Sequence, residues 1–274
     1  MDQRYYHIPA ERLGENSRIP LKIIEETEEV FRSMAAMMTD CIKANNKMGR
    51  MTVMICPVGP VGQYPYFVEQ VNRERIDLSG AWFFNMDEYL DDEGEYIDSK
   101  SPLSFRGFME REVYGRIDPG LVMPKAQRVF PDPKEPWKTD QLLEELGGAD
   151  IAFGGIGITG HLAFNEPEDM TAAEFSALPT RVQSIAPETR AVNAAGELGG
   201  ALESMPVRCV TIGMRQILGA KKLRLGVFRD WHRAVVRRAA YGDKTAAFPV
   251  TLVQEHPDAL ILVNGNAAKL PYGG

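Results

Sequence analysis

The sequence predicts an α/β protein with a modified doubly wound, mostly parallel sheet and helices on both faces. Short apolar runs, such as residues 51–56 and 81–85, alternate with segments of helical periodicity. Strands that alternate with helices in this way form parallel sheets that are buried on both sides. The chain has 274 residues and 44% hydrophobic content, which suffices for one large core, so we expect residues 1–274 to form a single domain.

The elements follow from the apolar patterns along the chain. Residues 1–20 are polar and irregular, and we expect an arm that lies over the domain. Helices are predicted at about 20–45, 63–72, 102–114, 139–146, 214–218 and 231–241 from apolar positions three and four residues apart. Strands are predicted at 51–56, 81–85, 149–153, 208–212, 223–228, 248–252 and 259–263. Residues 166–187 form a long connection, which we interpret as a lid.

Composition and charge exclude several classes of protein. The net charge is −7, the pI is near 5.3 and no Lys/Arg run is present, which argues against a nucleic-acid partner. No run of 18 apolar residues occurs, so no membrane span is expected. Cys41, Cys56 and Cys209 are widely spaced, which predicts neither a disulfide framework nor a metal site. The N-terminus does not resemble a signal peptide, so we expect a cytoplasmic protein.

A glycine-rich loop follows the predicted strand at 149–153. It reads Gly154-Gly155-Ile156-Gly157-Ile158-Thr159-Gly160-His161, and we expect Gly155, Gly157, Thr159 and Gly160 to contact a substrate. Glycine lets the backbone approach a ligand closely. Histidine is a common general acid or base, and Glu166 can orient His161 as its partner. The alternative is a structural histidine that donates to a backbone carbonyl.

A second pair of candidates ends an aromatic strand. Asp87 and Glu88 follow Trp82, Phe83 and Phe84, and an apolar setting would raise the pKa of a carboxyl toward that of a useful general base. The alternative is a solvated Asp-Glu pair at the start of a loop.

The residues that could form an anion pocket have weaker sequence signals than the two groups of candidates above. Gly59 and Gly62 lie in a strand-to-helix loop, where phosphate is often bound, but Pro57 and Pro60 remove N–H donors there. Arg229, His232 and Arg233 cluster at the start of the last long helix, whose N-terminus also favours anions. A solvated helix face explains the same charges, and we interpret Arg237 and Arg238 as surface charges.

Three segments together resemble the glucosamine-6-phosphate deaminase/isomerase family, which shares a Rossmann-like fold with 6-phosphogluconolactonases. They are Phe84-Asn85-Met86-Asp87-Glu88-Tyr89, the stretch from Gly155 to Pro167 that contains Gly-His-Leu-Ala-Phe-Asn-Glu-Pro, and Gln254-Glu255-His256-Pro257. Long motifs in the same order are a specific signal.

The resemblance implies an aldose–ketose isomerisation, with loss of ammonia from an amino sugar. Asp87 would move a proton between C2 and C1, His161 and Glu166 would assist ring opening, and Glu88 would be a supporting carboxylate. No metal or organic cofactor is needed. The partner is a small sugar or sugar phosphate, and family members are often homo-oligomers.

The departures from the family pattern concern the substrate. The family aspartate before Gly-His is Thr159 here, and a phosphate-binding arginine falls on Ala195. The phosphate-binding lysine falls near His232 or Arg233. Because each lost charge-assisted contact is worth about 1.5–3 kcal/mol, we expect an altered phosphate pocket.

Two other functions remain open on the sequence alone. The first is lactone hydrolysis on the same fold, in which His161 would be the main acid/base and Asp87 would matter little. The second is a non-catalytic sugar-binding or regulatory protein, which Thr159 and the proline-containing loop favour and the intact Asp87, His161 and Glu166 oppose.

Overall fold

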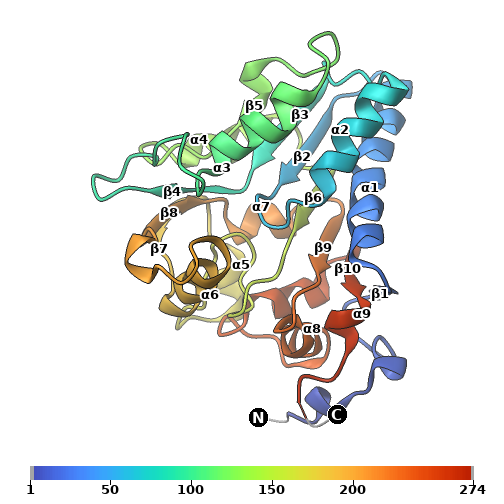
Figure 1. The fold of residues 1–274 in the computed structure, drawn as a ribbon, viewed down its shortest axis with the longest axis vertical. Coiled ribbons are helices and arrows are strands. Elements are labelled where there is room, and N and C mark those ends of the chain that lie inside the picture. The colour runs from blue at the N-terminus through green and yellow to red at the C-terminus, as the bar shows by residue number, and fades with distance from the viewer. Residues whose placement is uncertain (1–2, 273–274) are drawn as a thin grey trace.

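A seven-stranded parallel sheet forms the centre of the molecule in the computed structural model, which describes residues 3–272 (Figure 1). Every pair of neighbouring strands in it is parallel. The spatial order is β1 (Leu21–Ile24), β10 (Ala259–Asn264), β9 (Leu223–Val227), β6 (Ile151–Gly154), β2 (Thr52–Cys56), β3 (Ala81–Asn85) and β5 (Arg128–Val129). The prediction of a mostly parallel sheet is confirmed.

Helices cover both faces of this sheet, as the alternation along β2 illustrates. Val53 and Ile55 pack into a core with α4 (Trp137–Glu145), α7 (Met214–Leu218) and α8 (His232–Tyr241). Met54 and Cys56 point the other way, into a core with α1 (Thr27–Lys47) and α2 (Gln63–Glu74). Successive side chains of a strand face opposite sides, so a strand that is apolar at every position requires both layers.

A second, three-stranded antiparallel sheet holds one wall of the candidate site. Its order is β4 (Asp87–Leu90), β8 (Arg208–Thr211) and β7 (Arg181–Ser184). It packs with α3 (Phe105–Phe108) and α6 (Pro187–Glu197) around a small core that includes Tyr89, Phe164 and Cys209. The chain passes from the large sheet to the small one at Met86, whose carbonyl accepts from the Ile212 N–H at 2.7 Å.

Two predicted elements are wrong. Residues 20–24 do not begin the first helix, because Leu21–Ile24 pairs with β10 as an edge strand and α1 begins at Thr27. Residues 248–252 are not a strand, because Pro249–Glu255 is a 3-10 helix that begins with proline. Proline lacks the N–H that a strand would need and suits a first helical turn.

The segment 166–187 has more structure than a simple connection. It contains α5 (Ala172–Ser176) and β7, and α6 begins at its end. None of the described residues of this segment lines the cavity of about 430 Å³ that lies above the carboxyl ends of the central strands. A lid role for this segment stays a prediction.

The arm lies over α8, near the short C-terminal helix α9 (Gly265–Ala268) (Figure 1). The Arg18 N–H donates to the Ala240 carbonyl at 2.8 Å. The interpretation of Arg237 as a surface charge is wrong, because its side chain is fully buried between the arm, α8 and α9.

Candidate active site

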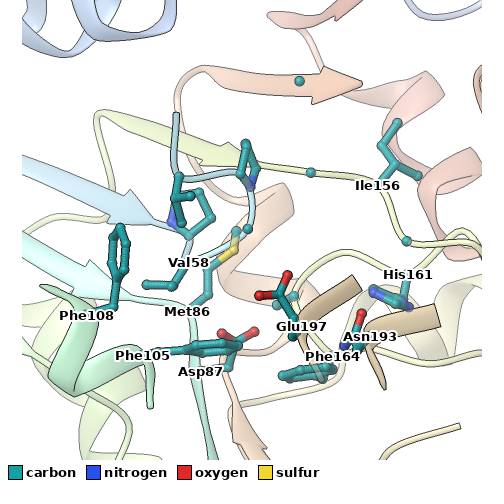
Figure 2. Close-up of a pocket in the computed structure, with 18 of the residues that line it drawn as sticks. Val58, Met86, Asp87, Phe105, Phe108, Ile156, His161, Phe164, Asn193 and Glu197 are labelled. Carbon is teal, nitrogen blue, oxygen red and sulfur yellow. The ribbon is translucent and has the colours of Figure 1, made fainter. Parts of the chain in front are cut away.

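Two of the predicted catalytic residues, Asp87 and His161, line a cavity of about 430 Å³ above the carboxyl ends of the central strands (Figure 2). Its walls include residues 57–62 after β2, 86–87 after β3, 155–157 after β6 and 226–232 at the end of β9. Open α/β sheets bind ligands at this end, where loops from several strands converge. Figure 2 shows Asp87 and His161 on the same cavity, although they are 74 positions apart in the sequence.

Asp87 is a buried carboxylate that faces the cavity. It is the first residue of β4, opposite Thr211 of β8, and is 6% exposed. Within residues 3–272 its carboxylate accepts no hydrogen bond and has no ion-pair partner. Burial, and secondly the charge of Glu88, raise the pKa of Asp87 well above its usual range. An unpaired, desolvated carboxylate is a stronger base than a solvated one, as a proton-transfer role requires.

Glu88 is not among the residues that line the cavity, and its predicted role as a supporting carboxylate stays a prediction. Its oxygens accept the N–H groups of Phe105 and Arg106 at 3.1 and 2.8 Å and the Ser104 hydroxyl at 2.8 Å. Successive residues of a strand face opposite sides, so Asp87 and Glu88 cannot both enter one site. Burial raises the pKa of Glu88 despite these hydrogen bonds. The residue anchors the start of α3.

His161 is held by a carboxylate and two hydroxyls on one ring nitrogen. Its Nδ1 lies 3.2 Å from Glu166 Oε2, 2.9 Å from Thr159 Oγ1 and 3.3 Å from Thr189 Oγ1. Thr159 also donates to Glu166 Oε2 at 2.8 Å. A carboxylate beside Nδ1 favours the tautomer with the proton there, which leaves Nε2 free to accept a proton from a substrate hydroxyl.

Glu166 is ionised beside His161. Burial works to raise the pKa of Glu166, but hydrogen bonds with His161, Thr189 and Thr159 outweigh it and lower the pKa below its usual value. Its other oxygen, Oε1, is buried without a hydrogen-bond partner among the described residues. The predicted pair of His161 and Glu166 is thus assembled, and the hydroxyls of Thr159 and Thr189 complete it.

The glycine loop shapes the site, and two of its amides are engaged within the loop. A Cβ on Gly157 would lie 2.0 Å from the His161 ring, and Gly160 has φ +81° with the Phe248 ring against it. The Gly157 N–H donates to the His161 carbonyl, and the Gly160 N–H donates to the Gly157 carbonyl. These two amides are therefore not available to bind an oxyanion. Gly155 and Gly157 line the cavity, whereas Thr159 and Gly160 lie behind it.

The predicted cationic cluster is mostly engaged elsewhere. His232 is buried, accepts the N–H groups of Phe228 and Arg229 on Nδ1 and contacts the Ile156 carbonyl through Nε2 at 2.9 Å. Burial lowers the pKa of His232 to about 3, so it is neutral. Arg233 contacts Asn266 and Asp230 outside the cavity. Only Arg229 reaches the cavity as a cation.

Sequence reasoning missed several lining residues. Glu197 and Asn193 come from α6, and the Asn193 amide donates to the Tyr89 hydroxyl at 3.1 Å. Phe31 comes from α1. No local signal marks these residues as site residues, because they reach the cavity only through packing.

Residues 3–272 contain neither a membrane-spanning helix nor a cluster of metal ligands. No helix within residues 3–272 is long and apolar enough to cross a membrane. No group of three or more His, Cys, Asp or Glu side chains in the same range could hold a metal ion.

The fold and this site together define the class of protein. No family model matches the chain. A solved structure of a monomeric glucosamine-6-phosphate deaminase superposes with a TM-score of 0.79 at 25% identity, covering 90% of this chain and 98% of that one. A 6-phosphogluconolactonase from Trypanosoma cruzi shares the fold, with a TM-score of 0.63 at 14% identity and 90% and 95% coverage. The chain is thus a Rossmann-like enzyme of the fold that these two groups share.

The sequence comparisons narrow this class. The chain is 27% identical over 251 residues to a glucosamine-6-phosphate deaminase of Mycoplasma mycoides, which covers 90% of this chain and 96% of the relative. It is 28% identical over 256 residues to that of Clostridium beijerinckii, with 90% and 98% coverage. The chain is similar over about 90% of its length to glucosamine-6-phosphate deaminases, and the resemblance predicted from its motifs is confirmed.

Proposed function

We propose that the protein isomerises an aldose to a ketose and releases ammonia when the substrate is an amino sugar. One observation carries the proposal: the unpaired carboxylate of Asp87 shares a cavity with His161, whose Nδ1 is held by Glu166. The relatives, named as deaminases of glucosamine 6-phosphate, support the same chemistry.

The proposed reaction has two stages: opening of the pyranose ring, and transfer of a proton from C2 to C1. His161 Nε2 takes the proton of the anomeric hydroxyl and returns a proton to the ring oxygen, which opens the pyranose ring. Asp87 then removes the C2 proton, the electron pair forms a C1–C2 double bond, and the C1 oxygen gains, through solvent, the proton that the C2 hydroxyl or ammonium group loses. Asp87 delivers its proton to C1, which gives a ketose, or an imine at C2 that water converts to the ketose and ammonia.

Replacing Asp87 tests the role of the base. Asp87→Asn is expected to lower the rate of C2-proton exchange by about 10²–10⁴-fold, the usual share of a general base. For the wild type, the rate is expected to fall as the pH drops through the raised pKa of Asp87, because the protonated carboxyl cannot accept the C2 proton. Proton exchange followed by NMR in D2O, with ammonia assayed in parallel, measures both.

The stability of the same variant controls for misfolding. A carboxyl with a raised folded-state pKa binds its proton more tightly when folded, so its contribution to stability is full below the unfolded pKa and is lost as the pH rises through the folded pKa. Asp87→Asn should therefore unfold at a higher temperature than the wild type at neutral pH. If the variant kept its activity and only His161 mattered, lactone hydrolysis would replace this proposal.

The location and assembly of the enzyme are also proposals. Cys41, Cys56 and Cys209 are free thiols, which suits a reducing cytoplasm. We keep the homo-oligomer as a prediction, which light scattering of the purified protein can test.

A further inference from the structure

The N-terminus of α2 is closed by an aromatic ring. This twelve-residue helix begins at the cavity after Gly62 and has no side-chain cap, so its first N–H groups would ordinarily attract an anion. The Phe31 ring lies so close that a Cβ on Gly62 would be 2.3 Å from it. Phe31 in turn packs edge-on against Phe228, with ring centroids 5.0 Å apart. The ring therefore hinders the approach of an anion to this helix end.

The start of α8 is closed in a different way. The N–H groups of Phe228 and Arg229, which precede the helix, both donate to His232 Nδ1 at 2.9 and 2.8 Å. The other ring nitrogen of His232 contacts the Ile156 carbonyl. The imidazole therefore occupies the position that a phosphate oxygen would need, and it carries no charge.

The charges on the cavity wall do not favour a dianion. Arg229 is the one Lys or Arg side chain among the described lining residues, and it is exposed. Asp87 and Glu197 place two carboxylates on the same cavity (Figure 2). Glu197 has no ion-pair partner within residues 3–272. A buried phosphate needs compensating charge and hydrogen bonds, whereas an ammonium group and hydroxyls suit carboxylates.

We infer that the enzyme acts on an amino sugar that carries no phosphate. The inference rests on the proposed isomerase/deaminase function and names the substrate class of that site. The end of the sugar remote from the reacting carbons lies against the rings of Phe31, Phe228 and Trp231, which offer apolar faces to the C–H groups of a sugar. Glu197 contributes to selectivity by repelling a phosphate.

The test compares glucosamine with glucosamine 6-phosphate on the full-length protein. C2-proton exchange and ammonia release give kcat/KM for each sugar, and calorimetry with their open-chain amino alcohols gives binding without turnover. We expect glucosamine and its analogue to be preferred by about tenfold or more, the effect of one charge-assisted hydrogen bond. Tighter binding or faster turnover of the phosphorylated compound, or no binding of either analogue, would overturn the inference.

The two proposals fail in distinguishable ways. Fast turnover of glucosamine 6-phosphate that Asp87→Asn abolishes would leave the proposed function standing and sink the substrate class. Binding of the unphosphorylated analogue without proton exchange would contradict the proposed function, whereas the preference of the cavity for an unphosphorylated sugar would stand.

Two variants test the physical cause of the expected preference for an unphosphorylated sugar. Phe31→Ser uncovers the start of α2, and Glu197→Gln removes a repulsive charge, so each should shift the ratio of the two kcat/KM values toward the phosphorylated sugar by several-fold. Phe108→Ser removes a ring of the same size from another part of the cavity wall, where Phe108 packs beside the ring of Tyr64 with centroids 6.0 Å apart, and should shift the ratio less than Phe31→Ser. An equal shift in the Phe108 variant would contradict the role given to Phe31.

Discussion

At the scale of single residues, Thr159 shows how a change in a motif keeps part of its chemistry. Its hydroxyl lies 2.9 Å from His161 Nδ1 and donates to Glu166 Oε2 at 2.8 Å. Glu166 therefore supplies the negative charge beside the imidazole, and the Thr159 hydroxyl orients the Glu166 carboxylate. The expected loss of one carboxylate beside His161 is real, but the position still belongs to the network that holds the imidazole.

Removing this hydroxyl should slow ring opening. Thr159→Val is expected to lower kcat/KM on a cyclic sugar by about tenfold, because a hydrogen bond to a charged group is lost. A 5-deoxy analogue, which cannot close a pyranose ring, should be converted at the wild-type rate, and Thr159→Ser should restore activity on the cyclic sugar. Equal losses on both substrates would mean that Thr159 has only a structural role.

The motifs predict residue identity better than residue direction. Asp87, His161 and Glu166 meet as expected, whereas Glu88 turns away because neighbouring strand residues alternate. That outcome requires residues 87–90 to be a strand, and a four-residue strand paired only with distant β8 leaves little trace in the sequence.

At the scale of elements, α3 depends on a carboxylate that precedes it by sixteen residues or more. Glu88 accepts two N–H groups at the helix start and the hydroxyl of Ser104, the N-cap residue. These donors have no carbonyl partner in the helix. Phe105, the first residue of α3, lines the cavity, so this anchor also positions one of its walls.

Truncating this anchor should cost stability. Glu88→Ala is expected to lower the free energy of unfolding by about 3 kcal/mol, because several buried donors lose a charged acceptor. KM should rise as Phe105 loosens. Urea unfolding at equilibrium measures the first effect, with Glu110→Ala, a largely exposed residue of the following turn, as the control. Similar losses in the two variants would refute the anchoring role.

The wrongly predicted elements share one cause. Residues 20–24 and 248–252 are short apolar runs, which fit a strand or a helix equally well without knowledge of their neighbours. Pairing with β10 made the first a strand. Proline at the start of the second favours a helical turn, and its Val250 N–H donates to Gly160 in the glycine loop.

At the scale of the whole molecule, Arg237 joins parts of the chain that are far apart in sequence. It is fully buried and donates to the carbonyls of Ile8 in the arm, Arg233 in α8, and Ala268 and Lys269 at the C-terminal end of α9. Burial lowers the pKa of its guanidinium, yet five hydrogen bonds hold it in place.

Removing the guanidinium should destabilise the domain. Arg237→Met is expected to cost about 3 kcal/mol, since several carbonyls lose their donors. Arg238→Met is the matched control, because Arg238 is half-buried and its guanidinium lies over the Phe248 ring at 4.1 Å; its loss should be below about 1 kcal/mol. Urea unfolding at equilibrium measures the free energy of unfolding of both variants. A smaller loss of this free energy for Arg237→Met than for Arg238→Met would contradict the structural role of Arg237.

The sequence alone determined the fold class, the central strands and the candidate catalytic residues Asp87, His161 and Glu166, because these depend on local apolar periodicity and on motifs that are contiguous in the chain. The tertiary structure alone decided which way Glu88 points, that His232 and Arg233 serve the fold, and that Phe31 and Glu197 reach the cavity. Each of these depends on packing between segments far apart in sequence. The candidate reaction is therefore visible in the motifs, whereas the selectivity of the site depends on the walls that the fold brings around them.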